Sequence, residues 1–324
     1  MRWVRRIGIV VGVALLAWAV AAVGWPAIWQ ELRRLGWRLA AVLMFYLVIF
    51  GLDTWGWRYA FTRHPKAPWG TLFLARLAGE AVNYVTPFAW VGGEPVKAYL
   101  LRQSHGVPMR EGISSVVIAK TTLAVGLLLF ALSGIGLAVW QAKLSAVLAR
   151  ASWGVFVGLS ILMGLFIVAQ RWGLFRRVGP QVRRVVGSHI VSSTGVRGRE
   201  IDVTIRRFYR SQRGRLALSV GFHFLGWVAG AAEVWFILQC LGIPITLAQA
   251  WIIESLWQLL KAGAFLIPAG LGAQEGGILL ICVALGLSLP SGLAMALVRR
   301  IRELFWTAVG LAVWSRYEYA FAKG

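Results

Sequence analysis

Long apolar stretches separated by short polar ones run along most of this 324-residue chain. A helix of about 20 apolar residues crosses a bilayer, and a segment in lipid must satisfy its own backbone hydrogen bonds, which favours helices. The pattern therefore predicts an all-α integral membrane protein. About six stretches are long enough to be full spans, near residues 7–29, 39–60, 112–140, 152–170, 215–241 and 292–315.

Two further apolar stretches, near residues 70–100 and 248–289, are broken in the middle by proline and glycine. Proline ends a helix because it lacks a backbone donor and clashes with the preceding turn, and glycine lets the chain reverse. Each stretch is therefore predicted to be a re-entrant hairpin of two half-helices. The first is flanked by basic loops and the second by uncharged ones, so we expect them to enter from opposite faces.

The two broken stretches share a spacing. Pro87 is followed seven residues later by Glu94, and Pro268 seven residues later by Glu275, which gives an offset of 181 residues in both cases. Glycines lie between each proline and its glutamate, and those counted as candidate site residues are Gly92, Gly93 and Gly272. The spacing favours an inverted repeat, although so few residues are identical that two unrelated kinked helices remain an alternative.

The whole chain, residues 1–324, is then expected to be a single polytopic domain. Repeat 1 covers about 39–170, a basic cytoplasmic loop with an amphipathic surface helix covers 171–214, and repeat 2 covers about 215–316.

Composition narrows the class of protein. The chain is 59% hydrophobic and only 14% charged, which excludes an ordinary soluble domain and a disordered chain. Its net charge is +22, and the positive-inside rule explains this excess without a nucleic-acid partner. Under the predicted topology 24 basic residues lie on one side and five on the other. We therefore expect an inner-membrane protein of bacteria with both termini in the cytoplasm.

Ionisable residues at membrane depth are costly and mark candidate functional sites. Arg76 and Glu80 are four residues apart on one helix face, which allows them to pair. Each hairpin is followed by cations within the next span, Lys120 in the first half and Arg299 to Arg302 in the second. The candidate lipid-binding residues are Glu80, Asn83, Pro87, Gly92, Gly93, Glu94, Lys120, Lys261, Pro268, Gly272, Glu275, Arg299, Arg300 and Arg302.

Several partners can be proposed for the intramembrane charges. Glu80 and Lys261 hold equivalent positions in the two stretches, so we expect them to pair across the repeat axis. Asp53 with Arg58 is interpreted as a local structural pair. His223 is interpreted as a hydrogen-bonded core residue, with a proton relay as the alternative. All of these charges can alternatively be ion pairs that only fix helix packing.

Motifs for known enzyme chemistry are absent from the sequence. Only two aspartates occur, Asp53 and Asp202, so there is no Asp-rich Mg²⁺ motif. There is also no phosphate-binding loop, no Cys/His zinc cluster and no Gly-x-Ser-x-Gly setting. We therefore expect a protein that is not an enzyme and needs no cofactor, with a metal-free lipid transferase as the remaining enzymatic alternative.

The stretches Arg76–Glu94 and Phe265–Gly277, with the ending Leu297–Leu304, resemble the paired motifs of the flippase-like membrane protein family, which is related to the transmembrane region of lysylphosphatidylglycerol synthases. The closest resemblance is to the hopanoid-biosynthesis-associated transporter branch. The family implies lipid movement between leaflets and gives weight to Glu94, Glu275 and the arginines of the last span. The resemblance covers no aminoacyl-transferase domain, so it does not imply lysyl transfer.

Two classes of function follow from the residues and this resemblance. The first is a lipid translocator without its own ATPase, whose cargo is a hopanoid, a phospholipid or a polyprenyl-phosphate lipid. The second is an accessory membrane protein that partners a lipid-modifying, lipid-biosynthesis or glycosyl-transfer enzyme. Transport by the isolated protein would favour the first, and stable co-purification with such an enzyme without transport would favour the second.

Overall fold

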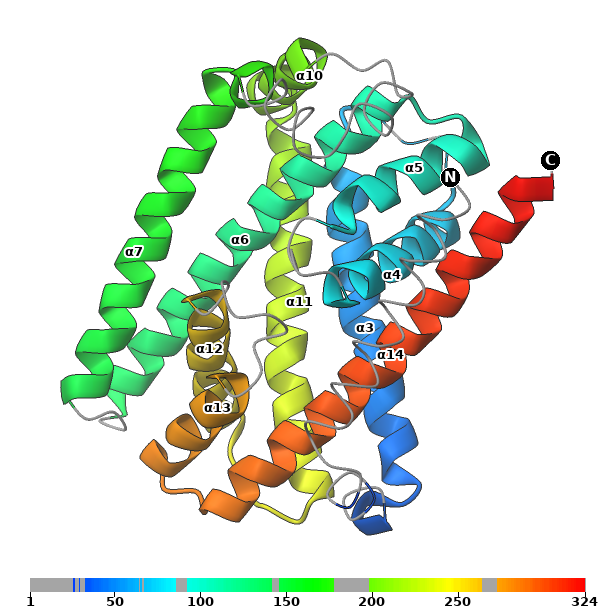
Figure 1. Cartoon of the computed structure of the whole chain (residues 1–324). Helices are drawn as coiled ribbons and strands as arrows, with labels where there is room; N and C mark the ends of the chain where they lie inside the picture. Colours follow the sequence, from blue (N-terminus) through cyan, green and yellow to red (C-terminus); the bar gives the residue numbers. More distant parts are fainter. Residues whose placement is uncertain are drawn as a thin grey trace.

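Helices make up the structure throughout (Figure 1). This computed structural model describes residues 26, 29, 33–63, 65, 67–85, 92–141, 146–177, 198–263 and 273–323, and none of these residues lies in a strand. The predicted all-α fold is therefore confirmed. The helices are α3 (Arg38–Tyr59), α4 (Trp69–Val85), α5 (Glu94–His105), α6 (Met109–Trp140), α7 (Ala146–Arg171), α10 (Gly198–Ser211), α11 (Arg213–Cys240), α12 (Leu247–Gly263), α13 (Ala273–Ala284) and α14 (Leu289–Lys323).

Four helical segments of the described chain are long and apolar enough to cross a membrane. They are Arg38–Tyr59, Met109–Trp140, Ala149–Arg171 and Arg213–Cys240, and they coincide with four of the predicted spans. The predicted span at 292–315 lies within α14, which is long enough to cross a membrane. Its apolar sequence is interrupted by four charged residues, Arg299, Arg300, Arg302 and Glu303. The predicted span at 7–29 falls almost entirely outside the described residues.

Each broken stretch forms two helices that pack against each other, α4 with α5 and α12 with α13. Figure 1 shows the first hairpin leading into α6 near the upper end of the bundle and the second leading into α14 at the lower end. The two hairpins therefore extend into the bundle from opposite ends, as expected. The connecting segments 86–91 and 264–272, which contain Pro87, Pro268 and Gly272, lie outside the described residues.

Helix α11 packs against α6 without an equally extensive contact of α3 with α14 among the described residues, but three other pairs of long helices are related: α3 with α11, α4 with α14, and α6 with α12. If the two halves are exchanged, so that α3, α4 and α6 become α11, α12 and α14, the first pair is unchanged and the other two pairs replace each other. An inverted repeat would produce this arrangement, since its twofold axis exchanges the two halves.

Small residues allow these pairs of helices to approach closely, as in other membrane bundles. A methyl group added to Gly134 of α6 would lie 1.8 Å from the Ser255 hydroxyl of α12. One added to Gly310 of α14 would lie 2.5 Å from the Leu77 carbonyl oxygen of α4. Each glycine thus lies directly against the neighbouring helix, and larger residues at these positions would displace the Ser255 side chain or separate the helices.

The basic stretch contains an amphipathic helix, α10, in line with the sequence. Ile201, Ile205 and Phe208 are buried against the bundle, while the arginines of α10 are exposed. Asp202 holds the preceding chain in place by accepting hydrogen bonds from the backbone N–H groups of Phe175 (3.1 Å) and Arg176 (2.8 Å). Residues 178–197 of the loop lie outside the described part of the chain.

Candidate functional site

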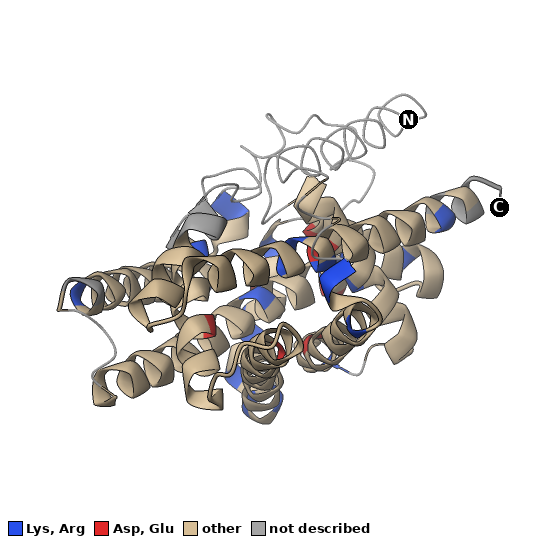
Figure 2. Ribbon diagram, turned by 90° about the horizontal axis from the view of Figure 1, so that it is seen from below, with Lys and Arg blue, Asp and Glu red and all other residues tan. Residues whose placement is uncertain are grey.

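Acidic and basic residues occur together inside the bundle rather than on its surface alone (Figure 2). They form two groups. We call the group around the hairpin of α4 and α5 the first network, and it consists of Asp53, Arg76, Glu80, Asn83, Glu94, Lys97 and Lys120. The second network surrounds α14 and consists of Glu233, Glu254, Lys261, Arg299, Arg300, Arg302 and Glu303.

Two lysines hold the carboxylates of the first network. Lys97 Nζ lies 2.7 Å from Glu80 Oε1 and 3.1 Å from Glu94 Oε2, and its side chain is only 4% exposed. Lys120 Nζ, from α6, lies 2.8 Å from Glu94 Oε1 and 4.0 Å from Glu80 Oε1. The lysines therefore connect α4, α5 and α6 around the tip of the hairpin.

The start of α5 is positioned by Asn83 and Gly93. Asn83 Oδ1 accepts a hydrogen bond from the Gly93 backbone N–H (2.7 Å), and Asn83 Nδ2 donates to Glu94 Oε1 (2.9 Å). A methyl group on Gly93 would lie 1.8 Å from the Gly79 carbonyl oxygen. Glu94 is the first residue of α5, where the helix dipole favours a negative charge, and Gly92 lies in the turn before it.

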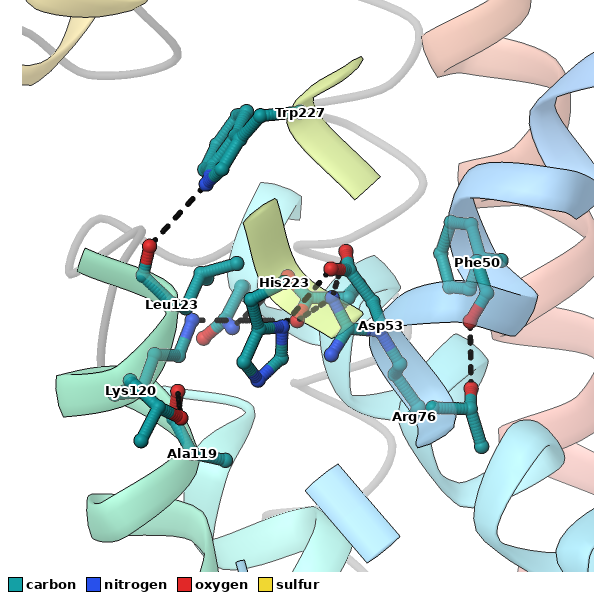
Figure 3. Close-up of polar contacts among 12 residues, drawn as sticks. Phe50, Asp53, Arg76, Ala119, Lys120, Leu123, His223 and Trp227 are labelled. Atoms are coloured by element: carbon teal, nitrogen blue, oxygen red, sulfur yellow. Dashed lines mark hydrogen bonds and ion pairs between the residues drawn. The ribbon is translucent and has the colours of Figure 1, made fainter. Parts of the chain in front are cut away.

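Asp53 joins the first network to the central helices. Arg76 donates a hydrogen bond of 2.8 Å to Asp53 Oδ2 and also lies 4.0 Å from Glu80. On its other side Asp53 Oδ1 lies 3.0 Å from His223 Nδ1, as Figure 3 shows. The predicted pair of Asp53 with Arg58 is therefore wrong, because Arg58 lies over the Trp55 ring instead. The interpretation of His223 as a hydrogen-bonded core residue is confirmed.

A small cavity, with a volume of about 10 Å³, lies beside the first network, close to the minimum room for one water molecule. The polar side chains that line it are Arg76, Glu94, Lys97, Lys120 and His223. None of its lining residues comes from α12 or α14. The first network thus borders a cavity to which the described residues of the second hairpin and of α14 contribute no lining residue.

Arginines of α14 carry the second network. Arg299 forms a short ion pair with Glu254 of α12 and lies 3.9 Å from Glu233 of α11. Arg302 forms a short ion pair with Glu233. The guanidinium groups also stack on aromatic rings, Arg299 on Trp257 and Arg302 on Tyr46, at 4.2 and 4.1 Å from the ring centres. Such contacts stabilise a buried cation.

Lys261 and Arg300 share a single carboxylate. Lys261 Nζ lies 3.5 Å from Glu303 Oε1, and Arg300 Nη1 lies 3.3 Å from Glu303 Oε2. The expected pair of Lys261 with Glu80 is therefore wrong, because each group has its partner within its own network. Arg300 also donates a hydrogen bond of 2.7 Å to the hydroxyl of Tyr84 on α4, which links the second network to the first hairpin.

Several predicted site residues are not placed by the structure. Pro87, Pro268 and Gly272 lie outside the described residues, and so does the side chain of Glu275, although its backbone belongs to the first turn of α13. The expected approach of Glu94 to Glu275 therefore stays a prediction. The remaining candidates divide between the two networks rather than forming one group.

The sequence interpretation missed important members of both networks. Both Arg76 and Lys97 are among the 24 basic residues assigned to the cytoplasmic side, although Arg76 was also expected to pair with Glu80 and lies 4.0 Å from it. Both are buried, which leaves 22 basic residues on that side against five. The sequence position of Lys97, three residues after Glu94 on one helix, could have predicted that these two residues pair. Glu233 and Glu254 carry no comparable local signal, since their partners lie on α14.

The charges of the first network balance, with three acidic and three basic residues. Across the parts of the chain that the structure describes, no cluster of His, Cys, Asp and Glu has the arrangement of a metal site. The chemistry that this arrangement offers is exchange of ion-pair partners, because a lysine can leave one anion for another without becoming unpaired.

The comparisons with known proteins agree with a membrane protein. Residues 6–310 match the family described as "Lysylphosphatidylglycerol synthase TM region". The chain is 26% identical over 325 residues to a "UPF0104 membrane protein" of Methanothermobacter thermautotrophicus (strain Delta H), covering 94% of this chain and 93% of that relative. No solved structure matches. The chain therefore belongs to the family of the lysylphosphatidylglycerol synthase transmembrane region.

Proposed function

We propose that this protein moves lipids with a polar or anionic headgroup between the two leaflets of the bacterial inner membrane. The candidate cargoes are a hopanoid derivative, a phospholipid and a polyprenyl phosphate. Under this proposal both termini lie in the cytoplasm, in line with the bias of basic residues. The family takes its name from enzymes that make a charged lipid, which favours a lipid as the cargo.

The observation that carries this proposal is the graded burial of the first network. Lys97 is almost fully buried, whereas the side chains of Lys120 and Glu80 are 29% and 31% exposed. The network thus has an accessible edge next to a buried interior. An ammonium group binds phosphate as a point charge. A phosphate headgroup can therefore replace Glu94 at Lys120 and leave that lysine paired throughout.

The second network offers an equivalent edge. The Lys261 side chain is 27% exposed and pairs with Glu303, which is 13% exposed. In our proposal the chain consists of two inverted repeats, about 39–170 and 215–316, each with one hairpin and one accessible lysine. The headgroup passes between the two networks while the acyl chains stay in lipid.

Leaflet exchange in proteoliposomes tests this proposal. Fluorescent versions of the three lipid classes are placed in both leaflets, and the rate at which the inner-leaflet label becomes accessible to an external quencher is measured. Glu94→Gln keeps the shape of the side chain but removes the charge that holds Lys120. We expect it to slow exchange about tenfold, which corresponds to roughly 1.4 kcal/mol of lost interaction.

Glu200→Gln is the matched control. Glu200 lies on α10 and forms an exposed pair with Arg110 at 3.8 Å, so the exchange rate should stay at the wild-type value. Equal rates for wild type and Glu94→Gln would contradict the role of the first network. Wild-type rates no higher than those of empty vesicles, for all three lipids, would contradict translocation and favour the accessory protein.

A further inference from the structure

His223 is the one described histidine that faces the cavity of the first network. Its side chain is completely buried. Nδ1 is held by Asp53 at 3.0 Å, while Nε2 has no hydrogen-bond partner among the described residues. When Nδ1–H donates to Asp53, the neutral ring keeps a lone pair on Nε2. The ring therefore has the geometry of a proton acceptor beside a cavity of about one water molecule.

The charged groups around this ring come from four helices. Asp53 of α3 contacts the ring directly through Oδ1, and its other oxygen, Oδ2, accepts a hydrogen bond from Arg76 of α4 (Figure 3). Glu94 and Lys97 of α5 and Lys120 of α6 line the same cavity. With a neutral histidine these groups and Glu80 sum to zero charge, and binding one proton gives a buried charge of +1.

We propose that His223 is a proton-binding site that couples lipid movement to the proton gradient across the membrane. This inference rests on the proposed function. The step is a simple acid–base reaction: a hydronium ion in the cavity gives its proton to Nε2 and leaves as water, and the imidazolium later returns the proton to water. No redox partner is needed.

Asp53 connects this proton to the hairpin. An imidazolium competes with Arg76 for the Asp53 carboxylate, because both then carry a positive charge. Arg76 already lies 4.0 Å from Glu80 and has a second anion within reach. When Arg76 moves toward Glu80, the 2.7 Å pair between Glu80 and Lys97 weakens. Since that pair joins α4 to α5, proton binding loosens the contact between these two helices.

The test is lipid distribution at steady state in proteoliposomes with an imposed gradient of one pH unit. One proton moved per lipid predicts a ratio of labelled lipid between leaflets of up to about tenfold, because one pH unit is a tenfold ratio of proton concentration. His223→Asn keeps an N–H donor for Asp53 but binds no proton, and its ratio should stay at one. His105→Asn, at the end of α5 and away from the cavity, is the matched control and should keep the wild-type ratio.

A second measurement separates this inference from the proposed function. In protein labelled with ¹⁵N-histidine, the His223→Asn spectrum assigns the His223 signals. We expect Nε2 to change from the unprotonated to the protonated shift between pH 8 and pH 4. If the wild-type protein moves lipid but the ratio of labelled lipid between the leaflets stays at one under the pH gradient, the proton coupling is overturned while the proposed function stands. If no lipid moves, the proposed function fails, and an Nε2 signal that does not change with pH then overturns the proton site as well.

Discussion

Lys97 Nζ lies 2.7 Å from Glu80 Oε1 and thereby joins the two arms of the first hairpin. The same ammonium group lies 3.1 Å from Glu94. One buried cation therefore bridges two carboxylates, one on α4 and one at the start of α5, and we expect the packing of these two helices to depend on it.

Replacing Lys97 by methionine should destabilise the protein. Lys97→Met keeps much of the volume but removes the buried cation between Glu94 and the partly exposed Glu80, a change that costs about 1–3 kcal/mol. Thermal unfolding in detergent measures the loss. The double variant Lys97→Met/Glu80→Gln should recover part of it, because one of the uncompensated charges is gone. A double variant no more stable than Lys97→Met would contradict the pairing.

Gly93 should not tolerate a side chain. Gly93→Ala would put a methyl group 1.8 Å from the Gly79 carbonyl oxygen and force α5 away from α4, so we expect a clear loss of thermal stability. Gly70→Ala on α4 is the control, since nothing lies within 4 Å of the added methyl group. Because Gly70 lies in the first turn of α4, that variant should stay within about 0.5 kcal/mol of wild type. Equal behaviour of the two variants would argue against the tight contact.

The pair of Arg302 with Glu233 should be essential for the stability of the central helices. Both side chains are buried, so Arg302→Met leaves Glu233 with only the longer contact to Arg299 at 3.9 Å, at a cost of about 3 kcal/mol. The exposed Arg316 lies on the same helix, and Arg316→Met should change stability by less than about 0.5 kcal/mol. Adding Glu233→Gln to Arg302→Met should restore part of the unfolding temperature. The account is wrong if Arg302→Met unfolds at the same temperature as wild type.

Local signals in the sequence were enough to predict the helical elements. Apolar runs predicted α3, α6, α7 and α11 as spans, because a membrane segment must be long and apolar. The proline and glycine breaks predicted both hairpins, and the second helix of the first hairpin begins at Glu94, just after its break. These properties depend on residues within a few turns of each other.

The partners of the charged residues were not predictable in this way. From the sequence alone Lys97 is interpreted as a loop cation. In the structure it is buried, because α5 packs against α4. Glu80 was expected to pair with Lys261, but it pairs with Lys97 of the same hairpin instead. Glu233 lies 69 residues from Arg302, and only the packing of α11 and α14 brings them together. Pairing at this range is set by helix packing, which a single sequence does not encode locally.

We propose that Lys120, at the accessible edge of the first network, receives an anionic headgroup. The most direct measurement compares the leaflet-exchange rates of an anionic and a zwitterionic phospholipid in the same vesicles, for wild type and Lys120→Gln. The account predicts that wild type favours the anionic lipid by about tenfold, roughly 1.4 kcal/mol, and that Lys120→Gln brings this ratio close to one. An unchanged ratio in Lys120→Gln would contradict it.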